Sequence, residues 1–358
     1  MPVPPARADE STAADPTAAA YRGLAGRRRL HALVLLAVAL ACLAADILLG
    51  PSGLTLSDLF TALLSPDAAD ASTRVIVWDI RLPQAAMAAL VGAALGLAGA
   101  EMQTILNNPL ASPYTLGVSS AAALGASLAI VLQTGVPGLP LDWLVPVNAF
   151  LFAALCGLLL DAVARRRGIG TAAIVLFGVA LVFSFNALTS LIQFVASAQA
   201  LQNLVFWTLG SMTRANWGTV ALMAVALAAA LPFALSQAWR LTALRLGEER
   251  AASFGVDVRR VRLGAIARVS VLSGLAVAFV GTIGFIGLVA PHIARRLFGE
   301  DHRYFLPGSA LTGALILSAA SLLSKNLLDG VIVPVGILTA LVGVPFFMAV
   351  LLRRQASL

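Results

Sequence analysis

The stretch RLTALRLGEERAASFGVDVRRVR, residues 240–262, is the longest polar segment in a chain that is otherwise almost continuously apolar. Apolar residues recur within it at helical spacing. Gly247 and Gly255 are placed to divide it, because glycine permits chain reversals and weakens a helix interior. The stretch therefore predicts two short charged helices between membrane spans. They serve either as a solvated connector or as a rigid projection offered to a partner, and we favour the projection.

The composition around this stretch is that of a membrane protein. Hydrophobic residues make up 59% of the 358 residues and charged residues only 11%, whereas soluble chains carry about a quarter charged residues. A chain of this length has room for about ten membrane helices and little else. Its basic residues lie at the ends of apolar runs, so the net charge of +7 does not indicate binding to nucleic acid.

Signatures of catalysis and of metal binding are missing from the sequence. Cys42 and Cys156 lie alone in apolar segments, which predicts neither a disulfide framework nor a metal site. The hydrolase, metalloprotease and nucleotide-binding patterns are also absent. We therefore expect no enzyme activity and no cofactor, and any ATP hydrolysis that drives this chain must come from a separate subunit.

Hydropathy divides the chain into a short tail and a large membrane domain. Residues 1–28 have the composition of a disordered tail, and residues 29–358 are predicted to form one transmembrane domain. A short surface helix is expected near residues 56–64. The segment 284–298 is short for a full span. The predicted spans are residues 30–49, 83–104, 114–133, 144–164, 171–195, 218–238, 263–282, 284–298, 305–325 and 335–352.

The distribution of basic residues predicts the orientation. If both termini are cytoplasmic, the outside keeps only four of the 24 basic residues: Arg74, Arg81, Arg214 and Lys325. Such an asymmetry is the positive-inside pattern of membrane proteins. It places residues 240–262 in the cytoplasm.

Small residues predict close helix packing and an internal repeat. Gly92, Gly99 and Pro109 recur as Gly274, Gly281 and Pro291 with the same spacings. The two copies lie five spans apart, on the second and the seventh predicted spans, so they cross the membrane in opposite directions. That arrangement is typical of the inverted repeats that build transport paths, although chance among many glycines is the alternative. The four glycines are also candidates for close helix–helix contact.

Two features within the membrane domain are candidates for function. Glu101 is the one acid well inside a span, where an ionisable group is costly and suggests function, but its place near the cytoplasmic end favours snorkelling to water. Pro109 and Pro113 preclude a regular helix over residues 107–114. This segment is either a simple connector or part of the inner mouth of a path. The mouth candidates are Asn107, Asn108, Pro109 and, in the second half, Pro291 and His292.

Several long motifs resemble one known family in the right order over residues 30–354. They are RLPQ (81–84), VGAALGLAGAEMQ (91–103), NNPLASPYTLGVSSAAALGA (107–126), FWTLGSM (206–212), LGEERAASFGV (246–256) and GFIGLVAPHIARRLFGEDHRYFLPGSALTGA (284–314). The chain resembles the FecCD/BtuC family, the permease subunits of type II ABC importers for iron–siderophore complexes, haem and vitamin B12. The resemblance implies a BtuC-like, all-α polytopic fold in the bacterial cytoplasmic (inner) membrane.

The resemblance also implies partners and their contact residues. A homodimer would carry two cytoplasmic ATPase subunits and an extracytoplasmic substrate-binding protein. The family's coupling helices fall on residues 244–258, with contacts at Leu246, Gly247, Glu248, Glu249, Ala251, Phe254, Gly255 and Val256. Its outer docking residues fall on Arg81 and Lys325. The chain departs from the family where an acid followed by an arginine is replaced by Ser321 and Lys325.

Import of a ferric chelate such as an iron–siderophore is the expected function, because it is the commonest role in the family. Haem and vitamin B12 are alternatives within the same family. A secondary transporter coupled to ions is a third alternative, which would require ion sites at broken helices near the midplane. The sequence offers few polar residues there. We expect the path itself to bind its cargo weakly.

Overall fold

The computed structural model describes residues 16–51, 53–166, 169–328 and 330–355, and these residues are almost entirely helical. The all-α prediction is therefore confirmed. In chain order the elements are α1 (Pro16–Leu48), α2 (Leu56–Leu64), α3 (Ala71–Val75), η1 (Ile76–Arg81), α4 (Leu82–Ile105), α5 (Val118–Leu132), α6 (Leu141–Ala164), α7 (Thr171–Phe194), α8 (Ala198–Thr208), η2 (Met212–Arg214), α9 (Trp217–Ser236), α10 (Ala238–Leu244), α11 (Glu248–Ser253), α12 (Val258–Val280), α13 (Ile286–Phe298), α14 (His302–Asn326) and α15 (Val335–Gln355).

Each predicted span corresponds to a helix. Seven helices among the described residues are long and apolar enough to cross a membrane, and α3, η1 and α4 join into one of 35 residues. The other three predicted spans correspond to the shorter apolar helices α5 and α15 and to α13, which has 13 residues. The surface helix predicted near residues 56–64 is α2.

The helical segments that were not predicted include the start of α1, the α3–η1 segment before α4, and α8. Residues 16–28, assigned from the sequence to the tail, continue α1, while residues 1–15 lie outside the described part of the chain. Helix α8 follows α7 after a short break, and the Ser197 side chain caps it by accepting a hydrogen bond from the Ala200 N–H (3.2 Å). It carries too many polar residues for hydropathy to reveal it as a separate helix.

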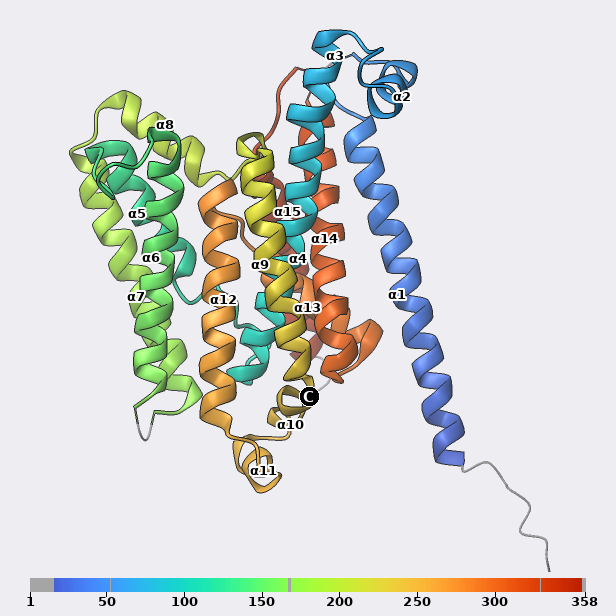
Figure 1. The fold of residues 1–358 in the computed structure, drawn as a ribbon. Coiled ribbons are helices and arrows are strands. Elements are labelled where there is room, and N and C mark those ends of the chain that lie inside the picture. The colour runs from blue at the N-terminus through green and yellow to red at the C-terminus, as the bar shows by residue number, and fades with distance from the viewer. Residues whose placement is uncertain (1–15, 52, 167–168, 329, 356–358) are drawn as a thin grey trace, which may run out of the picture.

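Helix α4 is the centre of the bundle. It packs against α14, α12, α13 and α9, while α5, α6 and α7 form one flank and α1 lies along α14 on the other (Figure 1). Helices α4 and α12 run in opposite directions in Figure 1, as the inverted repeat predicts. The last pair of the repeat differs in local structure, because Pro109 lies in a loop and Pro291 lies inside α13.

Small residues let α4 approach its neighbours closely. A Cβ on Gly92 would lie 2.3 Å from the carbonyl oxygen of Gly313 in α14, and a Cβ on Gly99 only 1.8 Å from that of Gly287 in α13. Neither contact leaves room for a side chain, so these two glycines are close-packing positions.

The other two glycines of the repeat lie in different surroundings. Gly274 faces Phe150 and Ala153 of α6, at 3.2 Å from a built Cβ. Gly281 lies beyond the last turn of α12 as its C-cap, with φ 81°, and a Cβ there would lie 2.3 Å from the carbonyl oxygen of Trp207 in α8. A positive φ of this kind favours glycine for conformational reasons.

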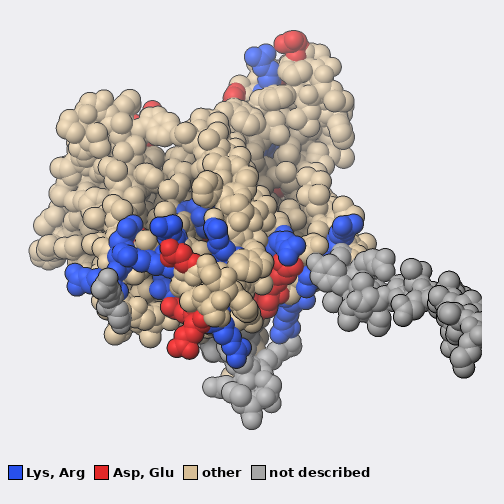
Figure 2. Space-filling model, turned by 60° about the horizontal axis from the view of Figure 1, so that its bottom comes forward, with Lys and Arg blue, Asp and Glu red and all other residues tan. Residues whose placement is uncertain are grey.

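Charge divides the two ends of the bundle. Figure 2 shows that Lys and Arg gather at the end that carries α10, α11 and the start of α12. We call this end the arginine-rich face. The opposite face carries α2, α3 and α8 (Figure 1).

A candidate coupling site on the arginine-rich face

Two short helices, α10 and α11, project from the arginine-rich face between α9 and α12 (Figure 1). Gly247 separates them with φ 104°, and Gly255 follows α11 with φ 79°. Both values are readily adopted only by glycine, so the division that the glycines predicted is confirmed. The pair begins earlier than the predicted residues 244–258, because α10 starts at Ala238 and ends at Leu244, and only α11 lies wholly within that range.

The predicted contact residues divide into anchors and exposed side chains. Ala251 and Val256 are buried, and Glu248 forms an ion pair with Arg262 of α12. Leu246 and Phe254, in contrast, are 55% and 57% exposed. Large apolar side chains exposed together on a projecting polar element suggest a contact surface for a partner.

A hollow of about 590 Å³ lies beside these two side chains. Residues from α10, from the turn that follows it, from the end of α11 and from the turn between α13 and α14 form its walls. They are Trp239, Thr242, Ala243, Arg245, Leu246, Phe254 and Glu300. The hollow and the exposed Phe254 together give the arginine-rich face both a cavity and a projection.

Arg245 braces α10 against two loops. Its Nη1 donates to the Asn107 Oδ1 (3.1 Å), and its Nε and Nη2 donate to the two carboxylate oxygens of Glu300 at 3.1 Å each. A two-pronged arginine–carboxylate contact is strong and fixes orientation. Arg295 Nε of α13 also lies 3.1 Å from Glu300 Oε1. The structure thus joins the predicted coupling segment to Asn107, a predicted mouth residue, through an arginine that the sequence did not single out.

His302 provides a second brace, inside the protein. The side chain is fully buried, with Nε2 at 2.8 Å from Thr104 Oγ1 of α4 and Nδ1 at 3.1 Å from Thr242 Oγ1 of α10. A neutral imidazole has one donor and one acceptor, and rotating hydroxyl groups can satisfy both. His302 therefore ties α10 to α4 from the start of α14. Among the three histidines, nothing in the sequence marked this one.

Glu101 does not snorkel to water. Its carboxylate is fully buried, and Arg268 Nε of α12 donates to Oε1 at 2.9 Å and to Oε2 at 3.1 Å. The prediction from the sequence was wrong because Arg268 reaches the same depth from another helix. A buried charge is tolerated when it is paired and hydrogen-bonded. The pair fastens α4 to α12 near the arginine-rich face.

The remaining mouth candidates are not gathered at one point. Asn108 Oδ1 accepts from the N–H of Leu110 (3.0 Å) and so shapes its own turn. Pro291 is buried within α13. His292 packs edge-on against Phe346 of α15, with ring centroids 5.8 Å apart. The second-half segment is helical, whereas the loop that carries Asn107 and Asn108 is not.

The two predicted docking residues near the opposite face are buried within this chain. Arg81 and Lys325 are each 5% exposed. Arg81 Nη1 donates to the carbonyl oxygens of Ile47 (2.9 Å) and Leu48 (3.0 Å) at the end of α1, where helix carbonyls lack partners within their own helix.

Lys325 is held by an acid from α1. Its Nζ lies 2.9 Å from Asp46 Oδ1, and Ser321 Oγ donates to Asp46 Oδ2 at 3.0 Å. Asp46 is fully buried. Lys325 and Arg81 therefore fasten α1 to α14 and to the start of α4, and their docking role stays a prediction.

The chain is similar in sequence to several known proteins. The profile of the FecCD transport family matches residues 35–353. The chain is 38% identical over 334 residues to the Fe(3+)-citrate import system permease protein YfmE of Bacillus subtilis, which covers 91% of this chain and 96% of that protein. It is 37% identical over 280 residues to the hemin transport system permease protein HmuU of Yersinia pestis, covering 78% and 84%. The vitamin B12 import system permease protein BtuC of Vibrio vulnificus is 35% identical over 330 residues, covering 92% and 96%.

A solved structure resembles the whole fold. It is described as an inward-facing conformation of a metal-chelate type ABC transporter, and it superposes with a TM-score of 0.78 at 28% identity. The match covers 90% of this chain and 98% of that chain. PsaBC from Streptococcus pneumoniae in complex with Fab shares the fold at a TM-score of 0.50 and 16% identity.

Proposed function

This chain belongs to the FecCD transport family and is a membrane permease of an ABC importer, and we propose that its cargo is a ferric chelate. One of the similar permeases is named for Fe(3+)-citrate and the similar solved structure for a metal chelate, while the permease named for hemin keeps haem as an alternative. The similarity to BtuC keeps vitamin B12, a cobalt chelate, as the second candidate.

The projecting α10–α11 pair supports the proposal that ATP hydrolysis drives this permease. In a homodimer, each copy would offer one such pair to one ATPase subunit. Phe254 and Leu246 would enter the ATPase surface, while an ATPase side chain would fill the hollow of about 590 Å³ beside them. The positive-inside pattern supports a cytoplasmic position for the arginine-rich face. The opposite face would then receive the substrate-binding protein.

The two braces give a route from the ATPase to the membrane helices. A displacement of α10 would reach the loop of Asn107 through Arg245, and would reach α4 through the Thr242–His302–Thr104 contacts. Hydrogen-bonded and packed elements that can take two arrangements carry coupling between distant sites. Arg245 of the α10 segment contacts the Asn107 loop directly, and Thr242 of α10 reaches Thr104 of α4 through His302.

The cargo path would bind weakly. Glu101 and Asp46 are the buried acids among the described residues, and each is neutralised by a basic side chain, Arg268 or Lys325. These charges are thus engaged within the protein rather than offered to a chelate. A path must bind its cargo weakly enough to release it. Recognition of the chelate would therefore rest with the external binding protein.

The identity of the cargo is tested by measuring uptake in cells with and without this chain. Labelled ferric chelates, haem and cobalamin are supplied separately, and the accumulated label is measured. We expect the chain to be required for uptake of a ferric chelate. A requirement for haem or cobalamin alone would replace the proposed cargo while leaving the family assignment intact.

The coupling role is tested by Gly255→Pro. Proline fixes φ near −65°, whereas Gly255 has φ 79°, so the connection between α11 and α12 must change course. We expect the variant to reach the membrane but to lose ATP-driven uptake. Gly138→Pro is the matched control, because Gly138 has the same φ of 79° and an equally open site in the loop that joins α5 to α6. Normal uptake by the Gly255 variant would contradict the proposal.

A further inference from the structure

We propose that a basic pocket between the α9–α10 turn and α12 binds the phosphate headgroup of an anionic phospholipid. The pocket has a volume of about 460 Å³, lies near the arginine-rich face and is lined in part by Gly255, the neighbour of Phe254, whose side chain lines the other hollow. The side chains that matter are Phe233, Gln237 and Arg240 from the α9–α10 segment, and Asp257, Arg260 and Arg268 from the α12 segment.

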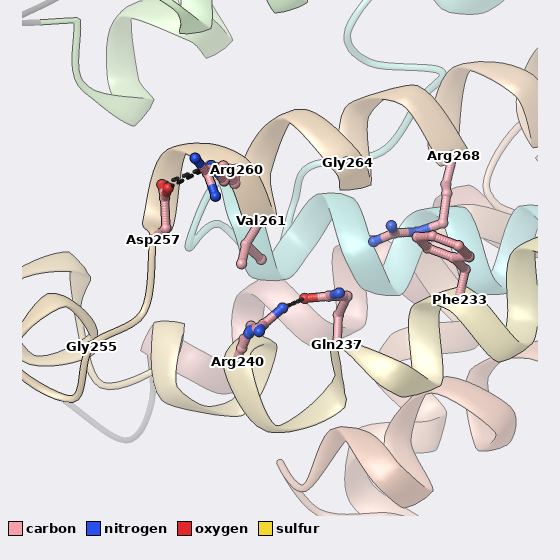
Figure 3. A pocket seen from close by; sticks show the side chains of 9 residues that line it. All are labelled: Phe233, Gln237, Arg240, Gly255, Asp257, Arg260, Val261, Gly264 and Arg268. Carbon is pink, nitrogen blue, oxygen red and sulfur yellow. Dashed lines mark hydrogen bonds and ion pairs between the residues drawn. The ribbon is translucent and has the colours of Figure 1, made fainter.

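The side chains converge on the space between the two segments. Figure 3 shows Arg268 extending from α12 towards the α9 side, next to the ring of Phe233, and Arg240 extending towards Gln237. Asp257 and Arg260 lie together at the other end of the pocket in the same view. Basic groups thus line the pocket along its length.

The charges in the pocket do not balance. Arg268 is paired with Glu101, and Arg260 Nε lies 3.0 Å from Asp257 Oδ2. Arg240 donates to a neutral acceptor, Gln237 Oε1 (2.7 Å), and forms no ion pair with the described residues. One positive charge therefore has no acidic counterpart in the pocket.

A phosphate could engage both exposed arginines. The Arg260–Asp257 pair is exposed, and exposed pairs of this kind are weak, so Arg260 can turn to a phosphate at little cost. Guanidinium groups recognise phosphate oxygens with two parallel hydrogen bonds. Arg240 and Arg260 are therefore the two side chains that would hold the headgroup.

The surface beside the pocket favours a lipid over a soluble phosphate. Phe233 is 66% exposed beside the arginines, and the same two helices carry further exposed apolar side chains: Val225 and Leu222 on α9 and Val271 on α12. A free phosphate ion has no use for this apolar surface, whereas the acyl chains of a lipid would cover it. Basic pockets between membrane helices are known headgroup sites.

The test measures how many lipid molecules the purified permease retains. The purified permease is placed in nanodiscs of phosphatidylcholine with phosphatidylglycerol, released into detergent and examined by native mass spectrometry. Arg240→Gln with Arg260→Gln removes two charges from the pocket. At about fivefold per arginine near an anionic surface, we expect the affinity for phosphatidylglycerol to fall about 25-fold.

Two further variants separate the pocket from general charge. Arg250→Gln with Arg259→Gln removes the same charge from neighbouring exposed positions that do not line the pocket, and we expect it to retain phosphatidylglycerol. Gly264→Phe fills the pocket without changing charge, because a Cβ there would already lie 3.3 Å from Arg268 Nη1. We expect this variant to release the lipid.

Four outcomes would overturn the proposal. An equal loss in the Arg250 and Arg259 control would show diffuse attraction to the membrane surface, and retention by Gly264→Phe would place the lipid elsewhere. Displacement of the lipid by inorganic phosphate would show a site for the free ion. If Arg240→Gln with Arg260→Gln keeps the lipid but loses the ATPase subunit in neutral nanodiscs, the pocket is a protein contact.

Discussion

Replacing Lys325 with methionine should strongly destabilise the permease. The change removes the ammonium group that lies 2.9 Å from Asp46 Oδ1, and leaves the fully buried Asp46 carboxylate with the hydrogen bond from Ser321. Removing one partner of a buried ion pair costs about 3–5 kcal/mol, because the other charge stays buried without compensation. Methionine keeps most of the lysine volume, so a cavity should add little to this cost.

Unfolding of the purified permease in mixed micelles, followed by circular dichroism, measures this cost. Arg74→Met is the matched control near the same face, because the Arg74–Asp67 pair is exposed and 3.8 Å long. Such a surface pair contributes about 1 kcal/mol or less. Asp46→Asn combined with Lys325→Met should recover most of the stability that the single variant loses.

The same measurement decides between two roles for Lys325. If Lys325→Met costs no more than Arg74→Met, the ammonium group is solvated, the reasoning from burial is refuted, and docking of the binding protein becomes the better explanation. A loss of several kcal/mol would mean that a charge reversal at Lys325 alters the fold as well as any docking surface.

Two further predictions follow from other contacts. Glu101→Gln should lower the free energy of unfolding by about 3–5 kcal/mol, because the buried Arg268 charge loses its partner. Adding Arg268→Gln removes that charge and should restore part of the loss. Equal losses in the single and double variants would argue against the pair. Hydrogen bonds from Thr55 hold the pKa of Asp58 in the folded protein below its ordinary value of 3.8. These hydrogen bonds therefore stabilise α2 fully above pH 3.8, and the stabilisation is lost as the pH falls through the lower pKa of the folded protein. Hydrogen-exchange protection of α2 should therefore decline only in strong acid, and Thr55→Ala should weaken it near neutral pH; protection that is unchanged in this variant would refute the cap.

Hydropathy predicted most of the fold because the membrane imposes a simple rule. Helices that cross it must be about 20 residues long and apolar, and such runs are visible in any single sequence. Helix α8 was missed because its polar residues interrupt the pattern, although the helix is capped and regular. The break between α10 and α11 was predictable because Gly247 and Gly255 are local signals.

The braces of the candidate site could not be predicted because they join residues far apart in the chain. Arg245 meets Asn107 across 138 residues, and Thr104 meets His302 across 198. Neither contact leaves a mark in the local sequence. The error on Glu101 has the same origin, since its partner Arg268 is 167 residues away.

The departure from the family pattern at Ser321 has a partner that the sequence did not reveal. Where the resemblance led us to expect an acid in this helix, Asp46 of α1 supplies the carboxylate that Lys325 contacts, and Ser321 donates a hydrogen bond to it. The acid and the base thus come from different helices here. Only the packing of α1 against α14 brings them together.

Import by proteoliposomes tests the central claim most directly. The purified permease is reconstituted with its ATPase subunit and binding protein, and accumulation of a labelled ferric chelate is measured with ATP on the ATPase side. We predict import by the wild type that requires ATP, and loss of import in Phe254→Asp, which places a charge on the exposed apolar contact without disturbing the buried anchors. Import that persists in Phe254→Asp, or that a proton gradient drives without ATP, would contradict the account.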